Sequence, residues 1–164
     1  MKRTALWLAI TVLFAACENS ADPLGGFLGG GGAITAAQAT GNWSFTLQRT
    51  TTLPCSTAPL ANGRVITAHL DVLSAGTLSS STSIWQNPIS GATQPLSGSV
   101  RLSDGITDLF FAAPAVRGDA VMELRGTMTS VGAFTGTLTD PAPGFTQVFG
   151  TGGCEYSVSG NKTS

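Results

Sequence analysis

The chain has 164 residues, which is enough for one domain with a tail. Only 10% of the residues are charged, the formal net charge is −1, and 21 residues are glycine. This composition is typical of turn-rich surface β-proteins, and the scarcity of basic residues argues against a nucleic-acid partner.

The N-terminus has the pattern of an export signal. Lys2 and Arg3 form a short positive region, and an apolar run follows over 5–16. This run is shorter than the roughly 20 residues that a membrane-spanning helix needs. The pattern therefore predicts a signal peptide over 1–16 that is removed from the mature chain.

The apolar run ends in Leu13-Phe14-Ala15-Ala16-Cys17, which resembles the lipobox of bacterial lipoproteins. The resemblance implies cleavage before Cys17 and attachment of diacylglycerol to its thiol, so that acyl chains anchor the protein in the membrane. Because Glu18 rather than Asp follows the cysteine, the resemblance also implies the outer membrane of a bacterial cell envelope. An ordinary secretory signal with a chance cysteine is the alternative.

The next segment, 17–40, is predicted to be the lipidated Cys17 followed by a flexible linker. It contains Gly25-Gly26-Phe27-Leu28-Gly29-Gly30-Gly31-Gly32. Glycines this dense lose too much backbone entropy on folding to be ordered. The glycine run is not a phosphate-binding loop, because no Gly-Lys-Ser/Thr sequence follows it.

A strict alternation of apolar and polar residues begins at Gly41–Arg49, where Trp43, Phe45 and Leu47 are the apolar members. A period of two predicts a strand with one buried face. The same reading predicts strands at 64–73, 76–85, 96–103, 106–113, 120–130, 133–140 and 154–162, with a short strand end at 145–149. The turns between them contain dipeptides such as Asn62-Gly63 and Asp104-Gly105.

Three of these strands carry a glycine between two large apolar residues. The segments are Leu96-Ser97-Gly98-Ser99-Val100, Leu124-Arg125-Gly126-Thr127-Met128 and Phe134-Thr135-Gly136-Thr137-Leu138. A glycine on the inward face weakens a strand unless it permits tight coiling or the close approach of a neighbour. We therefore expect these glycines to permit tight coiling or the close approach of a neighbour.

The cysteines suggest how the sheet closes. With Cys17 occupied by lipid, Cys55 and Cys154 can form one disulfide, which export permits. Cys55 follows the first strand and Cys154 begins the last, so the two can meet only if the sheet closes on itself. The alternative is a pair of free buried thiols. The expected fold is thus an all-β, antiparallel up-and-down barrel of about eight strands over 41–164.

The Gly41-Asn42-Trp43 opening of the first strand resembles the Gly-x-Trp signature of the lipocalin and avidin group, the calycins. The segment 133–137 is also similar to a strand of avidin-type barrels. The resemblance implies that Trp43 packs across the closed end of the barrel. It implies no ligand-contacting residue, because the rest of the chain does not match.

We find no catalytic motif such as Gly-x-Ser-x-Gly or His-Glu-x-x-His. His69 shares a strand face with Asp71, so a dyad that serves Ser79 or Ser81 is conceivable; a solvent-facing pair is the alternative. Two cysteines and one distant histidine lack the spacing of metal ligands. We therefore expect no enzyme activity, no metal and no cofactor.

Three residues are candidates for lining a ligand site. Trp85 stands out in a polar strand and could lie at the barrel mouth, where aromatic residues supply contact area. Asp108 lies in line with Ile106 and Phe110, which predicts that Asp108 and Phe110 point inward. The alternatives are core or loop packing for Trp85 and a rim position for Asp108.

Together these features predict a lipid-anchored, non-catalytic envelope protein whose barrel binds a small apolar ligand or a protein partner. A structural lipoprotein with a solid core and no ligand is the alternative. A barrel embedded in the membrane is disfavoured by the missing aromatic girdles.

Overall fold

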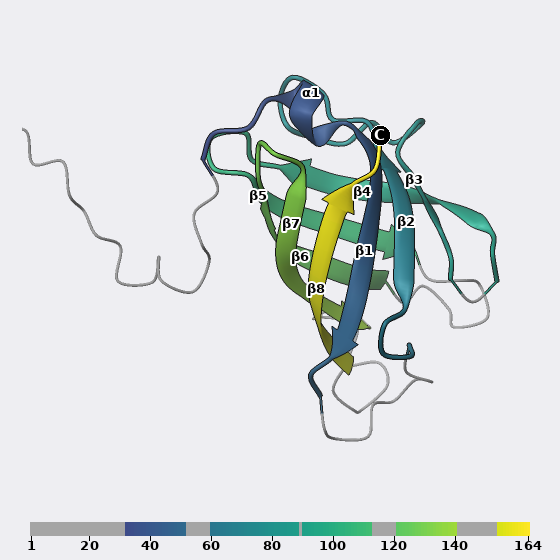
Figure 1. The fold of residues 1–164 in the computed structure, drawn as a ribbon. Helices are drawn as coiled ribbons and strands as arrows, with labels where there is room; N and C mark the ends of the chain where they lie inside the picture. The colour runs from purple at the N-terminus through teal and green to yellow at the C-terminus, as the bar shows by residue number, and fades with distance from the viewer. Residues whose placement is uncertain (1–31, 52–59, 89, 113–120, 141–153) are drawn as a thin grey trace, which may run out of the picture.

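The computed structural model describes residues 32–51, 60–88, 90–112, 121–140 and 154–164 (Figure 1). Within these ranges the chain forms one short helix and eight strands. The elements are α1 (Ala36–Ala39), β1 (Gly41–Arg49), β2 (Val65–Leu70), β3 (Ile84–Gln86), β4 (Thr93–Val100), β5 (Ile106–Ala112), β6 (Val121–Met128), β7 (Ala133–Asp140) and β8 (Cys154–Lys162). Each strand pairs antiparallel with the next, and β1 also pairs with β8. The predicted all-β up-and-down barrel of eight strands is therefore confirmed.

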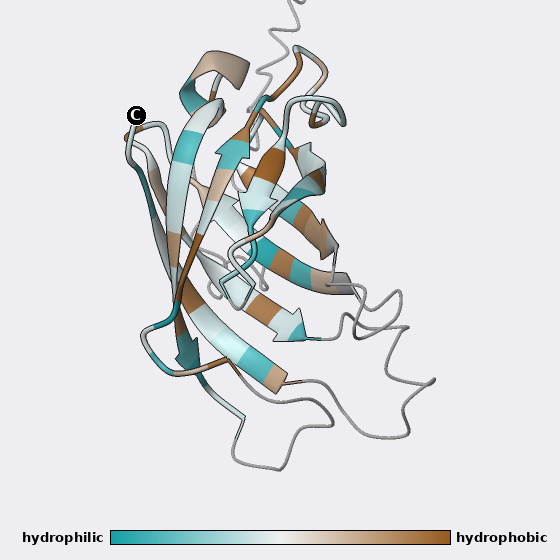
Figure 2. Ribbon diagram, turned by 90° about the vertical axis from the view of Figure 1, so that its right-hand side faces the viewer, coloured by the Kyte–Doolittle hydropathy of each residue, from teal (hydrophilic) through white to brown (hydrophobic). Residues whose placement is uncertain are grey.

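The alternation of residue types explains which face of each strand is buried. On β1, Trp43, Phe45 and Leu47 are at most 1% exposed, whereas the residues between them reach the surface. Figure 2 shows the same banding of hydrophobic and hydrophilic residues along several strands. Cross-strand register aligns the buried positions, since Phe45 lies opposite Ile66 on β2 and Gly160 on β8.

Large side chains fill the barrel interior. An eight-stranded barrel is just wide enough to be filled by side chains. Phe45 meets Phe134 edge to face at 5.3 Å between ring centroids, and Trp85 meets Phe111 in the same way at 5.2 Å. The largest fully buried side chains are those of Trp43, Trp85, Tyr156, Phe45, Phe111, Phe134, Leu47, Ile66, Leu70, Leu96, Leu109 and Leu124.

Inward glycines make room for two of these rings. Gly126 and Gly136 lie opposite one another on β6 and β7. A Cβ on Gly126 would lie 2.5 Å from Cζ of Phe134, and one on Gly136 would lie 2.8 Å from the same atom. Gly160 has the corresponding relation to Phe45, at 2.7 Å from Cδ1. The expected close approach at inward glycines is thus seen, and the approaching group is an aromatic ring.

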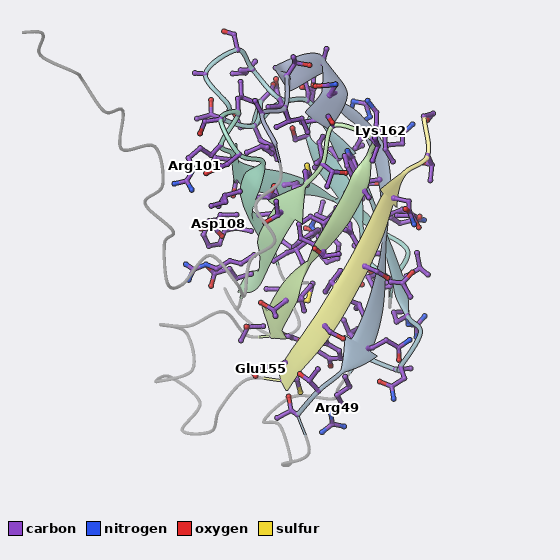
Figure 3. The ribbon with its side chains drawn as sticks, turned by 60° about the vertical axis from the view of Figure 1, so that its left-hand side comes forward. Arg49, Arg101, Asp108, Glu155 and Lys162 are labelled. Atoms are coloured by element: carbon purple, nitrogen blue, oxygen red, sulfur yellow. The ribbon has the colours of Figure 1, made fainter. Side chains whose placement is uncertain are left out.

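The two ends of the barrel differ. At one end, here called the α1 end, lie α1, the connection 71–83, the turns 101–105 and 129–132, and the last residues of the chain (Figure 1). At the other end, here called the long-loop end, β1, β3, β5 and β7 end and β2, β4, β6 and β8 begin. Figure 3 shows this polarity, with Arg101 and Lys162 at the α1 end and Arg49 and Glu155 at the long-loop end.

The start of the barrel domain corrects the predicted linker boundary. Residues up to 40 were expected to be flexible, yet Ile34 is 3% exposed and Ala39 is fully buried. The Ile34 N–H donates to the Leu102 carbonyl at 2.9 Å. Thr35 and Gln38 form a capping box at the start of α1. The domain therefore begins near residue 34; the signal peptide 1–16 and the linker 17–31 lie outside the described residues.

The third strand is also shorter than expected. The predicted strand at 76–85 becomes two isolated bridges, Val72 to Leu78 and Thr77 to Ser99, followed by β3. The chain turns between them, because the Ser83 N–H donates to the Ser79 carbonyl at 2.9 Å. The short strand expected at 145–149 lies outside the described residues.

Candidate functional site

The conceivable catalytic dyad is not formed. His69 and Asp71 lie on the outer side of the barrel, as the alternation predicted, but they have different partners. Nδ1 of His69 is 2.9 Å from Oδ1 of Asn42, whereas Asp71 accepts a hydrogen bond from the Thr82 hydroxyl. Within the described ranges, no three His, Cys, Asp or Glu side chains lie close enough to hold a metal ion.

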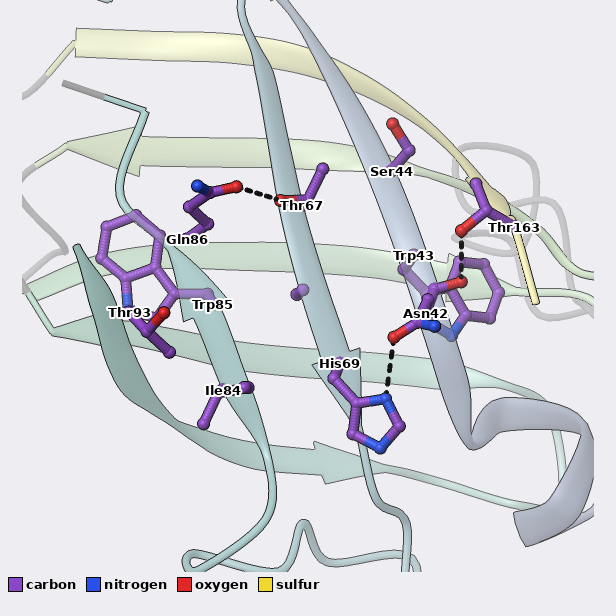
Figure 4. A pocket seen from close by; sticks show the side chains of 11 residues that line it. Asn42, Trp43, Ser44, Thr67, His69, Ile84, Trp85, Gln86, Thr93 and Thr163 are labelled. Carbon is purple, nitrogen blue, oxygen red and sulfur yellow. Dashed lines mark hydrogen bonds between the residues drawn. The ribbon is translucent and has the colours of Figure 1, made fainter. Parts of the chain in front are cut away.

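A hollow of about 510 Å³ lies on the outer face of the first three strands (Figure 4). The side chains around it that reach the surface are those of Asn42, Ser44, Thr67, His69, Ile84, Gln86, Thr93 and Thr163. Its floor is formed by Trp43, Ala68 and Trp85, which are at most 5% exposed and belong to the barrel core. We call this feature the β1–β3 hollow.

The chemistry of the β1–β3 hollow is neutral and polar. Its rim offers amides, hydroxyls and one imidazole, and no Asp, Glu, Lys or Arg is among its lining residues. Thr67 Oγ1 donates to Oε1 of Gln86 at 3.3 Å, which joins β2 and β3 across the hollow. Ile84 is 40% exposed and adds an apolar contact. Such a surface suits a ligand with neutral donors and acceptors, such as an exposed peptide segment.

The predicted inward direction of Asp108 and Phe110 is wrong. Leu109 and Phe111 are fully buried in the barrel, so the residues between them face outward. The Asp108 side chain is 35% exposed, and Figure 3 shows it on the outside of the barrel. Neither residue can line the interior, because the pleat places alternate residues on opposite faces.

On the outside, Asp108 belongs to a cluster with Glu123 and Arg125 of β6. Arg125 forms an ion pair with Glu123, and its Nε lies 3.7 Å from Oδ1 of Asp108. Glu123 is only 5% exposed. Burial raises the pKa of Glu123, and the opposing attraction of Arg125 does not cancel the effect. The cluster therefore holds a carboxyl group that resists ionisation.

Trp43 lies at the α1 end, beneath α1. Its indole Nε1 donates to the carbonyl of Ala39 at 2.8 Å, and its ring stacks on Phe45 at 6.0 Å with an interplanar angle of 7°. This hydrogen bond ties the last residue of α1 to the core. The relationship to calycins that motivated the predicted closing role of Trp43 stays a prediction.

Trp85 points into the barrel rather than into solvent. It is 1% exposed and packs against Phe111. Its indole Nε1 is buried and has no hydrogen-bond acceptor among the residues that the structure describes. A ligand role for Trp85 stays a prediction, but a buried donor without a partner costs about 1–3 kcal/mol and calls for an explanation.

The predicted disulfide falls partly outside the described residues, because Cys55 lies in 52–59. Cys154 is fully buried at the start of β8. The flanks of 52–59 are both tied to β8 within two residues of Cys154: the N–H of Thr50 donates to the Glu155 carbonyl at 2.9 Å, and that of Leu60 to the Tyr156 hydroxyl at 2.8 Å. This arrangement supports the pairing, which stays a prediction, as does lipidation of Cys17.

No protein-family model, curated protein or solved structure matches the chain. The candidate site therefore rests on its own geometry. In the parts of the chain that the structure describes, no helix is both long and apolar enough to cross a membrane.

Proposed function

We propose that the protein is a lipid-anchored, non-catalytic module of the bacterial cell envelope that binds a protein partner on the outside of its barrel. The supporting observation is the contrast between a packed interior and the β1–β3 hollow on the outer face. The barrel then acts as a rigid scaffold, and recognition takes place on its surface.

The packed interior disfavours a large apolar ligand inside the barrel. Such a ligand would have to displace rings such as those of Phe45 and Phe134, which are at most 1% exposed and pack against each other. Protein interiors have little void volume, and opening one costs several kcal/mol of lost packing. Binding on the outer face requires no such rearrangement.

The neutral rim of the β1–β3 hollow defines the expected mode of binding. Side-chain amides and hydroxyls such as those of Thr67 and Gln86 can pair with the backbone groups of a partner. Because the rim has no charged residue, the affinity should change little with ionic strength. A strong salt dependence would therefore count against this surface.

Anchoring rests on the lipobox resemblance around Cys17. The test is metabolic labelling with a clickable fatty acid, followed by the mass of the purified protein. The native chain should incorporate label and lack 1–16, whereas Cys17→Ser should do neither. Unlabelled native protein would remove the anchoring part of the proposal.

Partner binding is tested by placing a photo-crosslinking amino acid at Thr67 or Gln86 in cells. A matched control position is Thr137 on β7, which faces outward away from the hollow. Discrete protein adducts at the two hollow positions and none at Thr137 are expected. The same adducts at all three positions, or none at the hollow, would contradict the assignment.

A second candidate function follows from Trp85. Its buried Nε1 could donate to the oxygen of a small molecule held near the long-loop end, which would remove the cost of the unpaired donor. Native mass spectrometry of the purified mature protein should then show a bound species that Trp85→Phe loses. A single ligand-free mass for the native protein would exclude this candidate.

A further inference from the structure

The α1 end carries exposed apolar side chains on its loops. Val131, in the β6–β7 turn, is 87% exposed, and Leu73, in the β2–β3 connection, is 47% exposed. Val131 is the most exposed large apolar residue in the described ranges. Single exposed apolar side chains are common on protein surfaces, but those at loop tips can insert into a lipid interface when a membrane is close.

The chain enters the barrel at this same end. The hydrogen bond from Ile34 to Leu102 fixes the first described residues beside the β4–β5 turn, and Figure 1 shows that they reach the barrel close to α1. The described part of the chain therefore begins at the α1 end. A lipid on Cys17 would be attached through this end.

The length of the connection favours one orientation. About 15 residues separate Cys17 from Gly32, and a flexible chain of that length has an end-to-end distance of about 19–23 Å. The nine residues of β1 extend over about 30 Å. Because this typical distance is shorter than β1, an anchor at Cys17 would on average keep the α1 end nearer the membrane than the long-loop end.

Charge at the α1 end does not oppose this approach. Arg101 forms an ion pair with Asp104 at 2.6 Å. Lys162 donates to two carbonyl groups of α1, at 3.1 and 3.2 Å. Asp71, which accepts a hydrogen bond from the Thr82 hydroxyl, adds one negative charge at this end. Among the described residues, the charges of the Asp, Glu, Lys and Arg side chains at this end therefore sum to zero, and contact with lipid would depend on apolar groups.

We propose that the α1 end rests on the bilayer surface, with Val131 and Leu73 at the lipid interface. The inference rests on the proposed lipid anchoring and adds the orientation of the barrel. The β1–β3 hollow then faces sideways along the membrane, and the long-loop end points away from it. Both remain open to a partner.

The test places a tryptophan at each end of the mature, lipid-bearing protein in vesicles of phosphatidylethanolamine and phosphatidylglycerol. Val131→Trp reports on the α1 end. Val65→Trp is the matched control, because Val65 is 42% exposed and begins β2 at the long-loop end. The unsubstituted protein supplies the background emission of the native tryptophans.

Replacing part of the lipid by brominated lipid should quench most of the added emission of Val131→Trp, and that emission should be shifted to the blue. The added emission of Val65→Trp should be unchanged. Equal quenching at both positions, quenching at neither, or stronger quenching of Val65→Trp would overturn the proposed orientation.

Two further measurements separate this proposal from the one on which it rests. The mass of the purified protein shows whether Cys17 carries lipid, so a protein without lipid overturns both proposals. A protein that carries lipid but shows no quenching at Val131 overturns the orientation alone. Leu73→Ser with Val131→Ser should leave lipidation unchanged and reduce protection of the α1 end from proteolysis on vesicles.

Discussion

Replacing Gly136 by alanine would place a methyl group where the neighbouring strand already lies. The new Cβ would be 2.1 Å from the carbonyl oxygen of Arg125 and 2.7 Å from Cα of Gly126. These atoms belong to the β6 backbone, which cannot move away without breaking the ladder of hydrogen bonds between β6 and β7. The strain must therefore be taken up by the sheet.

The magnitude follows from two opposing effects. Overpacking a core costs about 1–3 kcal/mol, and backbone contacts place Gly136→Ala near the top of that range. The entropy that alanine removes from the unfolded chain returns about 0.4–1 kcal/mol. We expect a net loss of about 2 kcal/mol or more, and at about 4 °C per kcal/mol a fall in Tm of about 8 °C or more.

The identity of the contacted atoms predicts a rank order. Gly126→Ala also meets backbone, the Thr135 carbonyl oxygen at 2.2 Å, and should match Gly136→Ala. Gly160→Ala first meets ring atoms of the buried Phe45 instead of backbone, and because a side chain yields more readily than a paired strand, its loss should be smaller, about 1 kcal/mol. Ser159→Ala, an exposed change next to Gly160, is the control and should stay within about 0.5 kcal/mol.

The assay is urea and thermal unfolding of the mature chain, followed by circular dichroism. Phe134→Leu removes the ring tip that the added methyl group would meet. The loss of unfolding free energy in the double variant Phe134→Leu with Gly136→Ala should therefore be smaller than the sum of the two single losses, by about 0.5 kcal/mol or more. The reasoning is refuted if Gly136→Ala is no less stable than Ser159→Ala.

Three other predictions concern stability. Trp43→Phe removes the hydrogen bond to the Ala39 carbonyl and part of a buried ring, so the free energy of unfolding should fall by about 2 kcal/mol or more; unchanged urea unfolding would contradict it. Because burial raises the pKa of Glu123 in the folded state, its contribution is present below its unfolded pKa and is lost as the pH rises through the folded pKa. The Tm of Glu123→Gln should therefore fall less between pH 4 and pH 7 than the Tm of the native chain. Equal falls in Tm for the two proteins would contradict a raised pKa of Glu123. Reduction should cost about 2–4 kcal/mol if Cys55 and Cys154 are joined, and peptide mapping without reductant should show them in one linked fragment.

The turns illustrate how local sequence was sufficient. Asn62-Gly63 and Asp104-Gly105 predicted reversals of the chain, and Gly63 and Gly105 have φ values of 74° and 73°, a region that favours glycine. Local sequence was also sufficient to locate the strands whose residues alternate strictly between apolar and polar. The predicted bounds of β1, β7 and β8 agree with those observed, because one buried and one wet face leave a period of two in the residues themselves.

β5 shows where local sequence was not sufficient. Ile106, Leu109, Phe110 and Phe111 make this strand apolar on both faces, so alternation could not fix which residues point inward. The choice was made by register, which places Leu109 opposite Leu124 of β6. Asp108 and Phe110 were assigned to the wrong face for this reason.

The sequence by itself thus determined the all-β class, the positions of most strands and turns, and the inward glycines, because each of these features depends on the pattern of residues close together in the chain. Only the tertiary structure decided the early start of the domain at Ile34 and the composition of the β1–β3 hollow. The burial of Ile34 depends on contact with a turn far along the chain. The hollow joins residues such as Asn42 and Gln86, which meet only when β2 lies between their strands.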